Sequence, residues 1–229
     1  MSVRRFDAVL VDFYGTICAG DRLAVEAICG RVAAAYSLPV SPQELAVRWG
    51  CQFFNTLDHS NYARFQSLYE CEAASLRATL ADFSVEIDPA PFVADLLSYW
   101  TDPPLYADAL EFLRRLDLPV CCVSNADTKP LLGAIGKHHL RFDAVVTSEM
   151  ARCYKPCPEI FRYAVDRLGV PPERALHVGD SLHSDVGGAR GAGVSAAWLC
   201  RNDRIHDIGV CQPEFIVHSL TEVLSFIGL

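Results

Sequence analysis

The chain has 229 residues, which suits one large domain or a core domain with a modest insertion. Hydrophobic residues make up 51% of it, so a sizeable core can be buried. A net charge of −8 without a Lys/Arg cluster argues against nucleic acid as a partner, because phosphate backbones need basic patches. No apolar stretch reaches the ~20 residues of a membrane span. Asp7 and Asp12 interrupt the first apolar run, unlike a signal peptide, so we expect a cytoplasmic protein.

Short apolar runs recur along the chain and predict the buried strands of a parallel sheet. They cover residues 6–12, 118–124, 142–147, 174–180, 194–199 and 214–217. Helical spacing of apolar residues follows or separates these runs at residues 107–116, 158–168 and 220–227. This alternation predicts an α/β fold, namely a Rossmann-like doubly wound parallel sheet with helices on both faces.

Residues 19–100 interrupt the alternation, because they contain no convincing strand. Their apolar spacing predicts four helices, at residues 23–36, 42–53, 61–80 and 91–100. We therefore expect an all-helical cap domain over 19–100, inserted into a core domain made of 1–18 and 101–229. A cap in this position is expected to cover a site at the strand ends.

Polar side chains stand where the predicted strands end, which is where open α/β sheets bind ligands. In chain order they are Asp12, Ser124, Asn125, Lys155, Asp180 and Asp185. A carboxylate can be a covalent nucleophile, and several carboxylates beside a phosphate suit Mg²⁺. A hydroxyl and an ammonium group can hold a transferring oxyanion. Any one aspartate alone would more often be a turn or cap residue, but the ordered set predicts one catalytic crevice.

Four ordered motifs, spread over nearly the whole chain, resemble those of the haloacid dehalogenase superfamily. They are Asp12-Phe13-Tyr14-Gly15-Thr16, Val123-Ser124-Asn125, Tyr154-Lys155-Pro156 and Gly179-Asp180-Ser181-Leu182-His183-Ser184-Asp185. The helical segment 19–100 resembles the cap that the family places directly after its first motif. The resemblance therefore implies a hydrolase with a capped α/β core.

The resemblance also implies roles for individual residues. Asp12 would attack the substrate and form an aspartyl intermediate, while Lys155 would steady the nucleophile and the transferred group. The substrate would be a small molecule, bound by Gly15, Thr16, Ser124 and Asn125. The implied cofactor is Mg²⁺, and the implied metal ligands are Asp12, Asp180 and the backbone carbonyl of Tyr14. Asp185 would either bind the ion as well or orient the site from behind the direct ligands.

Tyr14 departs from the pattern of the family's phosphatases, which have an aspartate here that serves as general acid and then as base. A tyrosine pKa near 10 permits proton donation but makes a poor base at neutral pH. Tyrosine at this position, with Ser124-Asn125 in the second motif, resembles the 2-haloacid dehalogenases of the family. In those enzymes a cap arginine cradles the halide, and Arg48 is the candidate counterpart, although an exposed structural arginine is the commoner role.

The fourth motif favours a metal-dependent phosphatase. Asp180 and Asp185 are both present, and without a metal ion they would repel Asp12. We therefore expect a magnesium-dependent phosphatase acting on a small phosphorylated metabolite, as a monomer or homodimer. A 2-haloacid dehalogenase is the alternative, and a ligand-binding homologue with weak turnover is the third hypothesis.

Histidines and cysteines give weaker indications. His177 lies inside a predicted strand and is expected in the core or behind the site. His183 and His206 are further candidate catalytic residues, although His183 is expected to be exposed to solvent. The ten cysteines include no CxxC pair and are expected to be reduced and buried.

Overall fold

The computed structural model describes residues 5–201 and 211–227. Its centre is a six-stranded sheet of order β3-β2-β1-β4-β5-β6, in which every neighbouring pair is parallel. The strands are β1 Ala8–Val11, β2 Val120–Ser124, β3 Ala144–Thr147, β4 Ala175–Gly179, β5 Ser195–Leu199 and β6 Phe215–Val217. The predicted Rossmann-like parallel sheet is confirmed.

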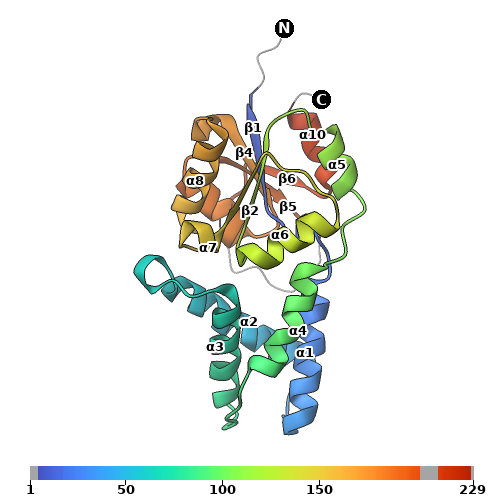
Figure 1. Ribbon diagram of the computed structural model, residues 1–229, viewed down its shortest axis with the longest axis vertical. Coiled ribbons are helices and arrows are strands. Elements are labelled where there is room, and N and C mark those ends of the chain that lie inside the picture. Colours follow the sequence, from blue (N-terminus) through green and yellow to red (C-terminus); the bar gives the residue numbers. More distant parts are fainter. Residues whose placement is uncertain (1–4, 202–210, 228–229) are drawn as a thin grey trace.

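Helices cover both faces of this sheet (Figure 1). On one face lie α5 Ala109–Arg115, α6 Thr128–Lys137 and α10 Leu220–Phe226, and on the other lie α7 Ser148–Ala151, α8 Pro158–Leu168 and α9 Gly188–Gly191. Strand β1 shows how the faces are built. Val9 and Val11 pack into the first buried cluster and Leu10 into the second, because successive strand side chains point to opposite faces.

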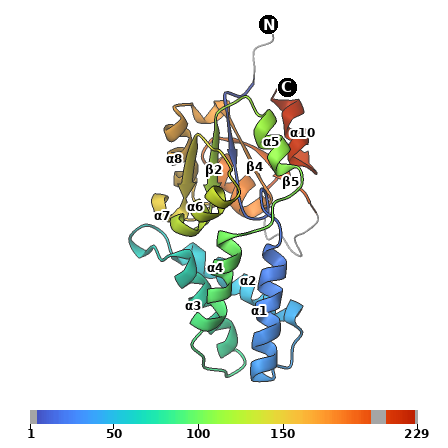
Figure 2. The same ribbon diagram turned by 45° about the vertical axis from the view of Figure 1, so that its right-hand side comes forward.

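Four further helices gather beyond the carboxyl ends of the strands (Figures 1 and 2). They are α1 Asp21–Tyr36, α2 Pro42–His59, α3 Leu68–Ala81 and α4 Ala90–Thr101. Their apolar faces form a buried cluster of their own, which includes Trp49. The indole Nε1 of Trp49 donates to Ser75 Oγ at 2.9 Å and so joins α2 to α3. This helical segment therefore has its own core and stands over the strand ends.

The prediction of one helix over residues 61–80 was wrong for its first turns. A 3₁₀ turn occupies Tyr62–Arg64, and α3 begins at Leu68. The cause is a capping box at Ser67, whose backbone N–H donates to Glu70 Oε2 at 2.7 Å while its Oγ accepts from Glu70 N at 3.3 Å. Helix α2 runs six residues beyond its predicted end at residue 53, and α7 was not predicted. Among the described residues, no helix is long and apolar enough to cross a membrane.

Candidate active site

Three aspartates meet at the carboxyl ends of the central strands. Asp12 follows β1, and Asp180 follows β4, which is hydrogen-bonded to β1. Asp185 reaches the same place from a short π-helical turn, Leu182–Gly187. One carboxylate oxygen from each of the three lies within 4.8 Å of the other two, and all three side chains are buried. The sheet order therefore brings together residues that are 173 positions apart in the chain.

Lys155 bridges two of these carboxylates. Its Nζ donates to Asp12 Oδ1 and to Asp185 Oδ1, both at 2.6 Å, and to the Val123 carbonyl at 3.1 Å. The side chain is almost completely buried. Burial alone would lower the pKa of Lys155, but the charges of Asp12 and Asp185 raise it above its ordinary value. Lys155 therefore remains a cation at the centre of the site.

Asn125 holds the backbone of Lys155. Its Oδ1 accepts from Lys155 N at 2.7 Å, and its Nδ2 donates to the Lys155 carbonyl at 3.2 Å. Both ends of the amide contact Lys155, so Asn125 positions this residue. Asn125 also lines a cavity at the strand ends, and its substrate contact stays a prediction. Ser124, the last residue of β2, is buried and, like Asp12, lines the same cavity.

Asp185 is locked in its ionised form. Its Oδ1 accepts from His177 Nε2 at 2.9 Å, and its Oδ2 accepts from Ser181 N at 3.0 Å. Burial alone would raise the pKa of Asp185, but Lys155 and His177 hold it well below its ordinary value. Burial lowers the pKa of His177, so its neutral ring donates through Nε2. His177 lies behind the site, as predicted.

Asp12 is the carboxylate with unsatisfied bonding capacity. Within the described chain, its buried Oδ2 has no hydrogen-bond partner. Burial raises the pKa of Asp12 to about 7, against the opposing charge of Lys155, and the charges of Asp185 and Asp180 raise it further. An additional cation beside Oδ2 would satisfy this oxygen and favour the ionised form. The three carboxylates could hold a metal ion on these grounds.

Glycines make room for the carboxylates. Gly15 has φ of +91°, and a Cβ at this residue would lie 2.8 Å from Asp180 Oδ2. Gly179 is likewise too close to a carboxylate for any side chain, because a Cβ there would collide with the side chain of Asp185. Thr16 is fully buried, and it does not line the cavity that its predicted substrate contact requires.

Tyr14 contacts the helical segment through its hydroxyl group. The OH donates to the carbonyl of Trp100 in α4 at 2.7 Å. Burial raises the pKa of Tyr14 far above its ordinary value. The phenol is therefore neutral at physiological pH and cannot act as a base, although its ring lines the cavity. Whether its backbone carbonyl binds a metal stays a prediction.

A cavity of about 860 Å³ joins the three carboxylates to the helical segment. Its wall on the helical side is mostly apolar and includes Trp49, Phe53, Phe54, Leu57 and Trp100. Such a mixture of apolar walls and a few convergent polar groups is typical of small-molecule sites.

Arg48 does not line this cavity. Its side chain is exposed on α2, where Nη2 donates to Glu44 Oε1 one helical turn away at 2.9 Å. The structure thus does not bring Arg48 to the predicted substrate site. Arg22 and Arg201 line the cavity instead, and neither belongs to a motif. No sequence signal pointed to them, since their position depends on how the segments dock.

The remaining candidates play smaller parts. His183 packs edge-on against Phe54 of α2 and is only partly exposed, contrary to the exposure expected of it. His206 lies outside the described residues. All ten cysteines are free, as predicted. Six are buried, but Cys51 is exposed and Cys157, Cys200 and Cys211 are only partly buried.

A family model described as haloacid dehalogenase-like hydrolase matches residues 6–193. The chain belongs to this family. Among relatives of this hydrolase, phosphoserine phosphatase of Thermus thermophilus is 39% identical over 127 residues. That match covers 52% of the chain and 50% of the relative, so the chain spans about half of the relative's length. Phosphoglycolate phosphatase of Shigella dysenteriae serotype 1 is 27% identical over 241 residues, covering 96% and 92%.

A solved structure shows the same fold as this haloacid dehalogenase-like hydrolase. It is the L-2-haloacid dehalogenase of Xanthobacter autotrophicus, which superposes with a TM-score of 0.76 at 23% identity. The similarity covers 97% of this chain and 98% of that one. The resemblance drawn from the four motifs is therefore confirmed at the level of the family and the fold.

Proposed function

We propose that the protein is a magnesium-dependent phosphatase that cleaves small phosphorylated metabolites through an aspartyl-phosphate on Asp12. The observation that carries the proposal is the buried set of Asp12, Asp180 and Asp185 beside one lysine. With His177 neutral, three carboxylates face one ammonium group, which leaves a formal charge of −2. A divalent cation balances that charge, and oxygen ligands of this kind suit Mg²⁺.

The residues present fit such an ion, because Asp12 Oδ2 is buried without a hydrogen-bond partner in the described chain. Asp12, Asp180, Asp185 and the carbonyl of Tyr14 would hold the ion. When bound, Mg²⁺ would neutralise the phosphoryl oxygens and the carboxylates around them.

Asp12 is the nucleophile in this proposal. Its carboxylate attacks phosphorus, the ester P–O bond breaks, and water later hydrolyses the acyl phosphate to regenerate Asp12. Lys155 orients the nucleophile through its bond to Asp12 Oδ1 and stabilises negative charge on the transferred group. Ser124 donates its hydroxyl proton to a phosphoryl oxygen from the end of β2.

The leaving oxygen takes its proton from water, because the Tyr14 hydroxyl already donates to the Trp100 carbonyl. Positioned acids typically contribute 10²–10⁴-fold to such steps. The enzyme should therefore prefer esters of acidic alcohols, whose oxygens leave without much help.

Phosphate release from p-nitrophenyl phosphate tests the proposal directly. We expect release with Mg²⁺, none with EDTA, and none from Asp12→Asn in either condition. Equal release with Mg²⁺ and with EDTA, or full activity in Asp12→Asn, would contradict the mechanism. A second variant, Tyr14→Asp, restores the family's acid and should raise turnover of alkyl phosphates more than that of the aryl phosphate.

A 2-haloacid dehalogenase is the second candidate, and Tyr14 is the observation that favours it. Halide departs without protonation, so a neutral phenol in place of an acid costs that reaction nothing. Chloride release from 2-chloropropionate in EDTA, with no phosphate release from the aryl phosphate, would establish this alternative. The buried carboxylate set favours the phosphatase, because a metal-free site must hold three carboxylates against one lysine.

We also propose that residues 19–100 act as a cap domain over a core domain of 1–18 and 101–229. The cavity supports this division, since its polar floor comes from the strand ends and its apolar wall from α1 to α4. In such an arrangement the cap selects the leaving group and the core transfers the phosphoryl group.

A further inference from the structure

One carboxyl group interrupts the apolar cap wall of the cavity without a partner of its own. The charged residues on this wall are Asp21, Arg22 and Glu72. Arg22 is engaged, because its Nε donates to Glu26 Oε1 at 2.8 Å. Across the described chain, the Glu72 carboxyl group makes no hydrogen bond and no ion pair, although the side chain is partly buried. An acid without a protein partner in a mostly apolar cavity wall is suited to pair with a cationic group of a ligand.

The backbone of α3 directs Glu72 into the cavity. Leu68 and Glu72 are one helical turn apart and both line it, so the same face of α3 is turned inwards. On the adjoining face, Cys71 packs against Tyr154 of the core, with Sγ 3.8 Å from the phenol oxygen. The contact of Cys71 with the core thus keeps the face of α3 that carries Leu68 and Glu72 turned towards the cavity.

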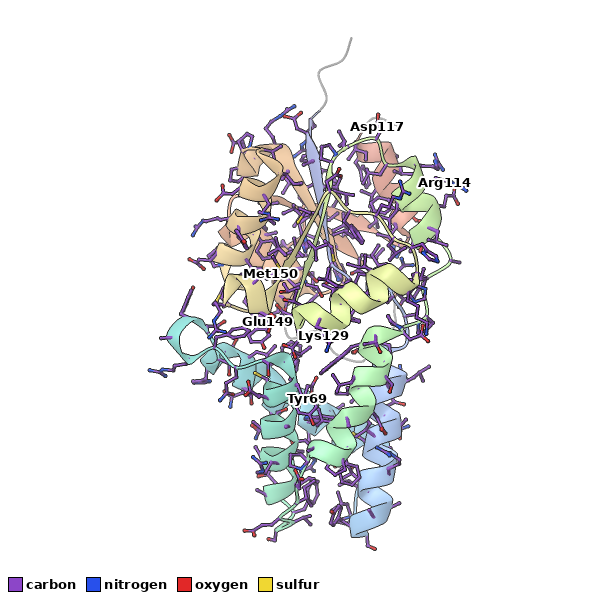
Figure 3. All side chains as sticks on the ribbon, viewed as in Figure 1. Tyr69, Arg114, Asp117, Lys129, Glu149 and Met150 are labelled. Carbon is purple, nitrogen blue, oxygen red and sulfur yellow. The ribbon has the colours of Figure 1, made fainter. Side chains whose placement is uncertain are left out.

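The core fixes the beginning of α3. Asp127, which follows β2, accepts from Leu68 N through Oδ1 at 2.7 Å and from Tyr69 N through Oδ2 at 3.1 Å. Figure 3 labels Tyr69 at the end of α3 that faces the core, with Lys129 and Glu149 on the other side of this junction. Because Glu72 lies one turn further along the helix, its distance from the strand ends is held by these bonds.

Glu72 lines the helical side of the cavity, on α3, whereas Asp12 and Asp180 line it at the strand ends. Burial, with the neighbouring charge of Asp21, raises the pKa of Glu72 well above its ordinary value. A phosphomonoester with its phosphoryl group at Asp12 would thus place the far end of its leaving group towards Glu72.

We propose that Glu72 determines specificity by binding a cationic amine on the leaving group of the substrate. This inference rests on the proposed phosphatase function and adds a substrate class to it, the phosphomonoesters of amino alcohols. An ammonium group would pair with Glu72 and also relieve its repulsion by Asp21. An alkyl group of the same size would fill the apolar wall but leave the acid unpaired, and such losses discriminate strongly between substrates.

The test compares matched substrates on wild type and variants. We would measure kcat/KM for 2-aminoethyl, 3-aminopropyl and 4-aminobutyl phosphate, each against the alkyl phosphate with methyl in place of the amine. The variants are Glu72→Gln, Glu72→Asp and the control Glu86→Gln, which removes the same charge from an exposed position of the helical segment. Release from p-nitrophenyl phosphate reports the reacting centre independently.

In wild type, we expect at least one aminoalkyl phosphate to be preferred about 10–100-fold over its alkyl match. Glu72→Gln should bring that ratio down to about one, Glu72→Asp should retain part of the preference, and Glu86→Gln should leave the ratio unchanged. Because the ratio is taken within one protein, partial misfolding cancels.

A wild-type ratio near one, or a ratio that survives in Glu72→Gln, would overturn the inference while the aryl phosphate is still cleaved. A preference for hydroxyalkyl over aminoalkyl phosphates would overturn it too, because a neutral donor would then suffice. Loss of aryl phosphate cleavage in wild type would refute the phosphatase function itself, and this inference with it.

Discussion

Replacing Gly15 with alanine tests whether the first motif makes room for Asp180, which we propose as a metal ligand. The added Cβ would lie 2.8 Å from Asp180 Oδ2 and 2.9 Å from both Cγ and Oδ1. All three contacts are shorter than a carbon atom tolerates, so the Asp180 side chain must move. The backbone is strained as well, because φ at Gly15 is +91°.

The matched control is Gly169→Ala. Gly169 also has positive φ, +68°, but a Cβ there meets nothing within 4 Å. It should therefore show the backbone strain alone, about 1–2 kcal/mol, or roughly 2–8 °C in Tm for a chain of this size. Gly15→Ala should show at least this loss of stability. In addition, it should weaken Mg²⁺ binding about 10–100-fold, as displacing the surroundings of a metal ligand typically does.

Thermal unfolding with increasing Mg²⁺ separates the two effects. A ligand that binds the folded state raises stability in proportion to RT ln(1 + [Mg²⁺]/Kd), so the concentration at which Tm begins to rise reports Kd. We expect that concentration to be unchanged in Gly169→Ala and about 10–100-fold higher in Gly15→Ala. If Tm began to rise at the same Mg²⁺ concentration in both variants, the reasoning would be refuted, because the clash with Asp180 would then have no consequence for Mg²⁺ binding.

Three further predictions follow from buried contacts. Lys155→Met leaves two buried carboxylates without their cation and should lower the free energy of unfolding by about 3–5 kcal/mol in urea at pH 7, so a loss below about 1 kcal/mol would contradict the bridge. Tyr14→Phe removes the bond to the Trp100 carbonyl and should lower the free energy of unfolding by about 0.5–1.5 kcal/mol. Its aryl phosphatase activity should fall less than about tenfold, whereas a hundredfold fall would identify Tyr14 as the proton donor. Asp127→Ala removes the acceptor at the start of α3 and should lower the free energy of unfolding by about 0.5–2 kcal/mol. Asp127→Asn should show only part of that loss. Equal stability of Asp127→Ala and wild type would exclude this capping role.

The parallel sheet and the polar residues at its strand ends could be predicted because their signals are local. A buried parallel strand is a short apolar run, and a polar residue directly after it lies at the ligand-binding edge. Asp12, Ser124 and Asp180 were found in this way, and the structure places them at the carboxyl ends of β1, β2 and β4, respectively, which are neighbours in the sheet. The start of α3 was missed although its capping box is visible in the sequence, because the apolar spacing before Ser67 continued the helical pattern.

Other features of the site depended on contacts between distant segments. Arg48 matched the expected cap position, yet it lies on the exposed surface of α2, paired with Glu44, and does not line the cavity. Asn125 stands in a motif, but only the tertiary structure shows its amide holding Lys155.

The amino-acid sequence by itself determined the alternation of strands and helices, the four motifs and hence the family, since each depends on neighbours along the chain. The tertiary structure decided which charges meet, because the bridge from Lys155 to Asp12 joins residues 143 positions apart. It also decided that Glu72, which belongs to no motif, faces the cavity, because that depends on how α3 docks against Asp127. Hydrophobic spacing specifies which face of a helix is buried, but the partner of that face is chosen by long-range packing.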